Sequence, residues 1–213
     1  MVGVAAGGHS KVMIETLRRG GQVEVVGLLD ARTELWGSKF ADIPVLGGDE
    51  LLPKLREQGI NHAFIGLGGS HDMRPRKRLY LKVRDLGFSI VSVIDPRAII
   101  SDSASIGHAP TVLAAAVINC GASISDNVIV NTGSIVEHDC IVGSHVHIAT
   151  GARLASGVVL EDGVHVGVGA VVRQCIRVHS SSVIGAGAVV VKDVPPGVIV
   201  VGVPARILRP VQN

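Results

Sequence analysis

The stretch "VIVNTGSIVEHDCIVGSHVHIATGARL", residues 128–154, carries an aliphatic side chain at every sixth position. Continued in both directions, the series runs from Ile100 to Val190, and all sixteen of its positions are Val, Ile or Leu. A helix has a period near 3.6 residues, and a β-sandwich would show strands at irregular spacings of about 8–12 residues. The sixfold period therefore predicts a solenoid of short strands.

The rest of each hexad fits a narrow core with tight corners. The residue four positions after each aliphatic one is mostly small, and Gly, Asp, Asn and Ser are common in between. Three hexads would close one coil of about 18 residues, and coils would stack as parallel strands about 4.8 Å apart. Residues 18 positions apart are therefore expected to lie one above the other, in about five coils.

The first part of the chain has a different pattern. Apolar stretches alternate with helical ones, which predicts a small parallel α/β sheet of the Rossmann-like kind. The expected strands are 2–6, 23–30, 62–68 and 88–94, and the expected helices are 10–19, 49–58 and 75–86. We therefore expect two domains, residues 1–95 and 96–213.

Three features meet at the carboxyl edge of the expected sheet. The first strand leads into "AAGGHSKV" (5–12), a turn that opens a helix whose free N–H groups favour phosphate. Asp30 ends the second strand, where a carboxylate accepts hydrogen bonds from a ribose or a base edge. "GLGG" (66–69) ends the third. Without a complete GxGxxG motif, this edge favours a mononucleotide or nucleotide-sugar site over a dinucleotide site.

A basic run, "RPRKRLYLKVR" (74–84), follows these features. Arg74 or Arg76 could add a phosphate partner, whereas a solvated helix face is the alternative that accounts for most charges of the run.

Composition excludes several function classes. A formal net charge of +2 and only one Trp, one Tyr and three Phe give no basis for nucleic-acid binding. No stretch reaches the roughly 20 apolar residues of a membrane helix, and the first residues do not form a signal peptide. Cys120, Cys140 and Cys175 are widely spaced without a zinc pattern, which indicates a reducing, cytoplasmic location.

The order of these parts resembles a known family. An α/β domain, then hexads that contain "NTGSIVEHDC" (131–140), then "VGVPARIL" (201–208), is similar to the bacterial hexapeptide-repeat nucleotide-sugar acetyltransferases over essentially the whole chain. These include bacillosamine-pathway and perosamine N-acetyltransferases and the sialic acid O-acetyltransferase type. The resemblance implies a left-handed parallel β-helix, acetyl-CoA as co-substrate, no metal, and a homotrimer with its site between two subunits.

The resemblance also implies roles for residues of the β-helix. His138 matches the general base, and Asp139 the carboxylate that raises its basicity, with Glu137 as the alternative partner. Asn131 matches a residue near the acceptor sugar, and His147 one that contacts acetyl-CoA.

Further positions match the binding sites of the two substrates. Val168 and Ala186 fall where relatives line the pantetheine groove, and the latter is often Gly there. The residues that match the site of the nucleotide diphosphate, sugar, ribose and base are Gly7, Gly8, His9, Asp30 and Gly68. Two departures affect this pocket: Ala5 stands where relatives often have Gly, and extra residues lie between Gly68 and Arg76.

Acetyl transfer from a thioester needs a neutral nucleophile, a base and donors for the oxyanion. An imidazole titrates near neutral pH, which suits His138 to the role of base. Ser156 lies 18 positions after His138, one coil above, and its backbone N–H is our oxyanion candidate. Cys140 occupies the small inward position and is interpreted as core, so we expect direct attack in a ternary complex.

Several functions remain open at this point. We favour acetylation of the 4-amino group of a 4-amino-4,6-dideoxy sugar linked to UDP or GDP, because "VEHDC" is closest to the N-acetyltransferase branch. The alternatives are O-acetylation of sialic acid or another hydroxyl, and a non-catalytic nucleotide-sugar-binding scaffold. A zinc-dependent carbonic anhydrase would use His147 and His165, 18 positions apart, with a third histidine from a neighbouring subunit. The carbonic anhydrase alternative does not explain the presence of a nucleotide-type first domain or of the Asn131 segment.

Overall fold

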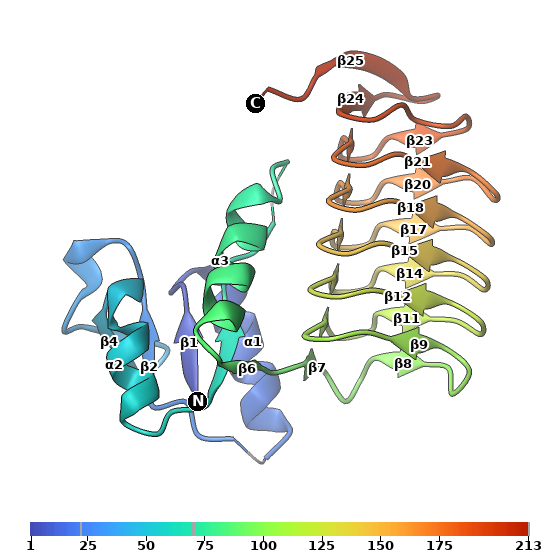
Figure 1. Ribbon diagram of the computed structural model, residues 1–213. Helices are drawn as coiled ribbons and strands as arrows, with labels where there is room; N and C mark the ends of the chain where they lie inside the picture. The colour runs from blue at the N-terminus through green and yellow to red at the C-terminus, as the bar shows by residue number, and fades with distance from the viewer. Residues whose placement is uncertain (22, 70, 213) are drawn as a thin grey trace. The chain divides into compact units, whose positions relative to one another are not determined.

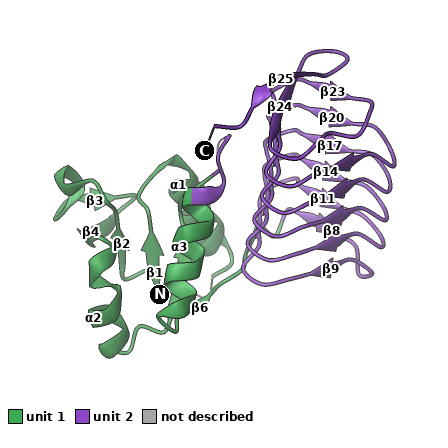
Figure 2. Ribbon diagram, turned by 45° about the horizontal axis from the view of Figure 1, so that its top comes forward, with its two compact units in different colours: residues 1–68, 75–96 green, residues 69–74, 97–213 purple. Residues whose placement is uncertain are grey.

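The computed structural model describes residues 1–213 except 22, 70 and 213. The chain forms two compact units (Figure 2): Met1–Gly68 with Pro75–Pro96, and Gly69–Arg74 with Arg97–Asn213. No feature of the sequence predicted that the short segment Gly69–Arg74 would belong to the second unit. Within the described part of the chain, no helix has the length and apolar character needed to cross a membrane.

The first unit is built on a six-stranded sheet. Its order is β3-β4-β2-β1-β5-β6, with β1 (Val2–Val4), β2 (Gly27–Leu29), β3 (Lys39–Phe40), β4 (Ile43–Gly47), β5 (His62–Ile65) and β6 (Ser89–Ile90). β1 pairs in parallel with β2 and β5, so the predicted parallel arrangement is confirmed. The second predicted strand is shorter than expected, and β7 (Val93–Ile94) follows β6 as a separate strand.

The sequence did not predict the antiparallel hairpin of β3 and β4, which makes the sheet mixed. Its two-residue turn is Ala41–Asp42, and both residues have positive φ, 50° and 66°. Such a turn is normally signalled by Asn-Gly or Asp-Gly. Ala-Asp carries no such signal, so the hairpin was missed.

Helices occupy the three predicted regions. They are α1 (Gly8–Arg19), α2 (Leu52–Glu57) and α3 (Arg74–Asp85), with short 3₁₀ segments η1 (Thr33–Leu35) and η2 (Asp49–Leu51). α1 buries Met13, Ile14 and Leu17 in a core shared with Leu28 and Phe64. This packing fixes the first turn of α1 relative to the ends of β1 and β2.

The second unit is a coil of two-residue strands stacked in parallel (Figure 1). One face holds β8 (Ile99–Ile100), β11 (Val117–Ile118), β14 (Ile135–Val136), β17 (Arg153–Leu154), β20 (Val171–Val172) and β23 (Val189–Val190). A second holds β9 (Ser105–Ile106), β12 (Ser123–Ile124), β15 (Ile141–Val142), β18 (Val159–Leu160) and β21 (Arg177–Val178). The third holds β10 (Thr111–Val112), β13 (Ile129–Val130), β16 (His147–Ile148), β19 (His165–Val166), β22 (Val183–Ile184) and β24 (Val198–Val201), with β25 (Arg206–Pro210) antiparallel to β24.

The sixfold period is confirmed as the core of this coil. Each predicted aliphatic position is the second residue of a strand, and those from Val112 to Val190 are at most 2% exposed. Ile118 pairs with Val136, and Val136 with Leu154, so neighbours along the coil axis differ by 18 residues as predicted.

Tight corners separate the strands, and many contain a residue in the left-handed conformation. Glycine occupies several of these positions, including Gly133 and Gly151. Asp139 occupies one as well, with φ 59°. Aspartate is one of the few residues that adopts this conformation readily, and the corner places it directly beside His138.

Candidate functional site

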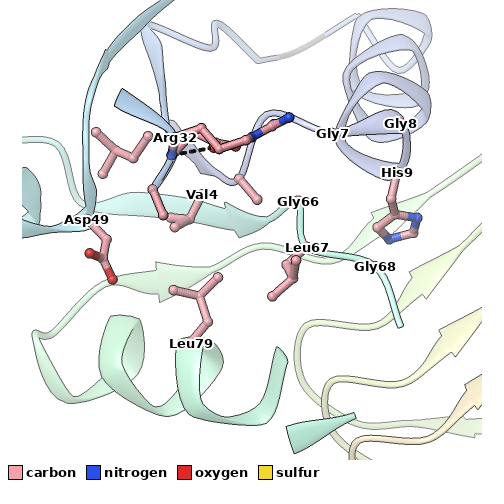
Figure 3. Close-up of a pocket in the computed structure, with 14 residues that line it drawn as sticks. Val4, Gly7, Gly8, His9, Arg32, Asp49, Gly66, Leu67, Gly68 and Leu79 are labelled. Atoms are coloured by element: carbon pink, nitrogen blue, oxygen red, sulfur yellow. Dashed lines mark hydrogen bonds and ion pairs between the residues drawn. The ribbon is translucent and has the colours of Figure 1, made fainter. Parts of the chain in front are cut away.

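The first unit contains a cavity of about 440 Å³ at the carboxyl ends of β1, β2 and β5 (Figure 3). It lies at the sheet edge that the sequence predicted. The lining residues are Val4, Ala5, Gly7, Gly8, His9, Leu29, Asp30, Ala31, Arg32, Asp49, Gly66, Leu67, Gly68 and Leu79. All five residues predicted to hold the nucleotide sugar in this unit are among them.

The start of α1 forms one wall of the cavity. Gly7 is the N-cap, and no side chain makes a capping hydrogen bond there. A Cβ atom added at Gly7 or Gly8 would meet nothing within 4 Å. Close packing therefore does not require glycine at either position, and the backbone is left open to a ligand that the N–H groups and helix dipole attract.

Two glycines after β5 bring the chain close to this wall. A Cβ at Gly66 would lie 2.7 Å from the Ala5 carbonyl oxygen, and one at Gly68 would lie 3.2 Å from the His9 Cβ. Gly66 therefore tolerates no side chain. The sequence singled out Gly68 and not Gly66, because only the folded chain shows which glycine touches the neighbouring backbone.

Ala5 adopts a conformation that favours glycine, with φ 83°. Its N–H donates to the Leu29 carbonyl at 2.7 Å, so the conformation is fixed by the junction of β1 and β2. We expect Ala5→Gly to raise the free energy of unfolding by about 1 kcal/mol, since the relief of backbone strain exceeds the entropy cost of glycine. Urea unfolding curves of both proteins test this, and a less stable glycine variant would contradict it.

Asp30 lies at the cavity, but its carboxylate is already engaged. Oδ2 accepts the Ala6 N–H at 2.7 Å, and Oδ1 accepts Nε and the backbone N–H of Arg32 at 2.8 and 3.0 Å. Hydrogen bonds from Arg32 hold the pKa of Asp30 at about 2, against the opposing effect of burial. The predicted contact of Asp30 with ribose or base would therefore compete with bonds that the fold already makes.

This network predicts a pH-dependent stability. Because the folded pKa lies below the ordinary value of 3.8, Asp30 stabilises the fold above that value and loses the contribution as the pH falls toward about 2. We expect Asp30→Asn to lower the free energy of unfolding by about 2 kcal/mol at pH 7. Unfolding measured from pH 7 to pH 2 should show the difference from wild type shrinking below about pH 4. A difference that stays constant over this range would refute the assignment.

His9 lines the cavity, and the buried Arg76 lies close enough for its charge to act on the His9 imidazole. Burial, with a smaller contribution from the Arg76 charge, lowers the pKa of His9 to about 3. Its Nε2 is buried and makes no hydrogen bond to any described residue. Arg76 is only 1% exposed and donates from Nη1 to the carbonyl oxygens of Ile65 and Leu67. Arg76, one of the two candidate phosphate partners of this run, is therefore buried and anchors the chain that leaves β5.

The second unit presents the predicted catalytic pair. Nδ1 of His138 lies 2.7 Å from Oδ2 of Asp139, and the two side chains are 51% and 72% exposed. Glu137 is occupied elsewhere: its Oε2 accepts the Asn119 amide at 3.0 Å and the His138 backbone N–H at 3.3 Å. Of the two carboxylates left open by the sequence, Asp139 is the one in contact with the imidazole. A proton on Nδ1 leaves Nε2 as the basic nitrogen.

Asn131 and His147 form a second polar group, and Asn131 precedes strand β14 whereas His138 follows it. The Asn131 amide nitrogen is 3.1 Å from Nε2 of His147, while its amide oxygen accepts the Thr132 N–H. The rings of His147 and His165 meet edge to face with centroids 5.0 Å apart, which confirms the predicted stacking. Burial, with the nearby His71, lowers the pKa of His165 to about 4, so this ring is neutral at physiological pH.

The candidate oxyanion donor and the inward cysteine also have clear positions. Ser156 follows His138 one coil on, as predicted, and no hydrogen bond to another described residue uses its backbone N–H. Cys140 is fully buried, its thiol donates to the Ala155 carbonyl, and burial raises its pKa. This environment is that of a core residue.

The predicted residues of this unit fall at two different corners of the coil. The first corner comprises 131–134, 149–152, 167–170 and 185–188, and it holds Asn131, Val168 and Ala186, with His147 beside it. The second corner comprises 137–140, 155–158 and 173–176, and it holds His138 and Ser156. The strand β14 lies between them, and equivalent positions of the two corners are six residues apart, about 20 Å of extended chain. One chain therefore does not bring these two groups together.

Comparisons with known proteins identify the family. The family model for the PglD N-terminal domain matches residues 2–83. The crystal structure of PerB from Caulobacter crescentus, in complex with CoA and GDP-perosamine, is 40% identical with a TM-score of 0.90, over 97% of this chain and 95% of that one. The chain belongs to the nucleotide-sugar acetyltransferases.

Further members of the nucleotide-sugar acetyltransferases have the same architecture. The acetyltransferase domain of PglB from Neisseria gonorrhoeae is 33% identical with a TM-score of 0.86, over 97% of this chain and 98% of that one. WeeI from Acinetobacter baumannii is 25% identical with a TM-score of 0.75, over 98% and 99%. A search among curated proteins returned no match. The predicted α/β domain followed by a left-handed β-helix, and the predicted acetyltransferase class, are confirmed.

The metal site of the carbonic anhydrase alternative depends on His147 and His165. Within the described ranges, no group of three or more His, Cys, Asp or Glu side chains is arranged to hold a metal ion. The His165 ring instead packs edge to face against His147, whose Nε2 lies 3.1 Å from the Asn131 amide nitrogen.

Proposed function

We propose that the protein transfers the acetyl group of acetyl-CoA to the 4-amino group of a GDP-linked 4-amino-4,6-dideoxy sugar. The observation that carries this proposal is the 2.7 Å contact between His138 and Asp139 on an exposed corner of the coil. The choice of GDP is supported by PerB, whose crystal structure holds GDP-perosamine. That structure also holds CoA, and a solved structure of the PglB acetyltransferase domain is in complex with acetyl coenzyme A.

In the proposed mechanism, the neutral amine attacks the thioester carbonyl directly. The new N–C bond forms, the C–S bond breaks, and the amine proton passes to Nε2 of His138 and then to the departing thiolate. Asp139 keeps the proton on Nδ1 and stabilises the imidazolium. The Ser156 N–H stabilises the oxyanion. Cys140 takes no part, because its thiol is buried and its raised pKa disfavours the thiolate.

The proposed assembly is a homotrimer in which the first corner of one subunit meets the second corner of the next. The separation of Asn131 and His147 from His138 by a whole strand supports this arrangement, since acetyl-CoA and the acceptor must meet one base. The face between the corners has mostly aliphatic outward residues, including Ile99, Ile135 and Val171, and is suited to the threefold axis.

The proposed location is the cytoplasm, where acetyl-CoA and nucleotide sugars are available together. Cys120, Cys140 and Cys175 are free thiols, which is compatible with a reducing compartment.

A thiol-release assay with acetyl-CoA tests the function directly. The acceptors are GDP- and UDP-linked 4-amino-4,6-dideoxy sugars, the matching 4-hydroxy compounds, and sialic acid, with the product identified by mass spectrometry. Turnover with an amino sugar and none with its 4-hydroxy counterpart supports N-acetylation. Turnover with only a hydroxyl acceptor would replace the proposal with O-acetylation, and binding without turnover would leave a nucleotide-sugar scaffold.

A further inference from the structure

Arg32 follows the end of β2 and lines the cavity of the first unit (Figure 3). It is the one arginine or lysine among the described residues that form this lining. Its side chain is 53% exposed, yet it is held in a defined position. No motif of the sequence points to Arg32, which lies two residues after Asp30.

The hydrogen bonds of Arg32 leave one end of its guanidinium available. Nε donates to Oδ1 of Asp30 at 2.8 Å. Nη2 donates to Oδ2 of Asp30 at 3.1 Å and to the Ala6 carbonyl at 2.9 Å. These bonds use three of the five N–H groups. Both N–H groups of Nη1 make no hydrogen bond to the residues that the structure describes.

The segment that carries Arg32 is itself fixed. Nε1 of Trp36 donates to the Asp30 carbonyl at 2.8 Å, which ties the chain after β2 into a compact turn. The Ala6 N–H and carbonyl both bond to the Asp30–Arg32 pair. The guanidinium is therefore preorganised, and little side-chain entropy would be lost when Nη1 binds a ligand.

The position of the guanidinium indicates which part of a ligand it meets. Ala6, whose carbonyl accepts from Nη2, directly precedes the N-cap Gly7, so the guanidinium lies beside the start of α1. Figure 3 shows the Arg32 side chain extended along the rim toward Gly7. Helix N–H groups, the positive end of the helix dipole and a guanidinium together favour an anion with several acceptor oxygens.

We propose that Arg32 is the cation that binds the diphosphate of the nucleotide sugar, and that Asp30 is a positioning residue that holds it there. This assignment rests on the proposed function for the identity of the ligand. It gives Asp30 an indirect role, because both oxygens of its carboxylate serve Arg32 and Ala6. It also explains how a cavity lined by Asp30 and Asp49 accepts a multiply charged anion.

Binding of GDP, UDP, GMP and guanosine to wild type and to Arg32→Met and Arg32→Lys tests the proposal. Trp36 is the only tryptophan and is bonded to Asp30, so its fluorescence reports binding. We expect Arg32→Met to weaken GDP and UDP about 10- to 100-fold, as for a lost charge-assisted hydrogen bond, and guanosine by no more than about twofold. Arg32→Lys should have affinities for GDP and UDP between those of wild type and Arg32→Met, since lysine keeps the positive charge but lacks the paired N–H donors of the guanidinium.

A matched control is Arg84→Met. Arg84 is similarly exposed, pairs with Asp85 at 2.9 Å, and does not line the cavity. It should leave all four affinities unchanged. An equal loss for GDP and guanosine in Arg32→Met would mean that Arg32 only shapes the cavity, and a loss for GDP but not UDP would mean that it reads the base. Either result overturns the proposal.

Kinetics separate this inference from the proposed function. In the acetyl-transfer assay, Arg32→Met should raise the KM for the nucleotide sugar about 10-fold or more and leave the KM for acetyl-CoA unchanged. If wild type turns over and this variant has an unchanged KM, the inference fails and the function stands. If wild type binds GDP through Arg32 without turnover, the function fails and the inference stands.

Discussion

His138→Ala is expected to lower kcat by about 10²- to 10⁴-fold, the usual contribution of a general base. Both KM values should stay close to wild type, because the side chain is half exposed and its contact is with the adjacent Asp139. The measurement is steady-state thiol release with the best acceptor from the substrate panel. A kcat within about threefold of wild type would remove His138 from the mechanism.

The two neighbouring carboxylates provide matched controls for this prediction. Asp139→Asn should also lower kcat strongly, because an amide no longer holds the proton on Nδ1. Glu137→Gln should have a much smaller effect, since Oε2 of Glu137 bonds to Asn119 and to the backbone of His138, not to the imidazole. The reverse order of effects would assign the supporting role to Glu137.

The coil was predictable because its aliphatic residues recur at a fixed interval of six positions. Each hexad uses one aliphatic residue for the core, so the sequence fixes which side chains point inward and which residues stack at a distance of 18. The same arithmetic placed His147 against His165 and Ser156 one coil from His138. The sequence predicted a carboxylate partner for His138 but left Asp139 and Glu137 open, since both are adjacent to it, and the structure shows the contact with Asp139.

Features that depend on tertiary contacts were not predictable. The turn Ala41–Asp42 adopts positive φ angles without the residues that normally signal them. Asp30 was correctly placed at the cavity, but its engagement by Arg32 depends on how the chain after β2 folds back. Arg76 was a candidate phosphate partner within a basic run, and only the packing of α3 shows it to be buried. The local sequence predicts which residues lie at the edge of the sheet. It does not predict which of their polar groups form hydrogen bonds within the folded chain.

Two inactive variants are expected to restore activity when they are combined. His138→Ala changes the second corner of the coil, and His147→Ala changes the residue bonded to Asn131 at the first corner. Each variant alone should be nearly inactive. If every site takes one corner from each of two neighbouring subunits, random mixing in a closed ring leaves about a quarter of the sites intact. Chains with different tags, expressed together and purified through both tags, form only mixed trimers, in which one of the three sites is intact, so they should regain about a third of the wild-type activity per site.

The control pair is His138→Ala with Asp139→Asn. Both changes lie at the second corner, so no arrangement of subunits brings an intact His138 and Asp139 together except within one chain, and neither chain has both. This mixture should stay at the level of its more active parent. If the first pair also fails to recover while mixed assemblies form, the two corners cannot serve one site across subunits. The substrates themselves would then have to bridge the two corners within a single chain.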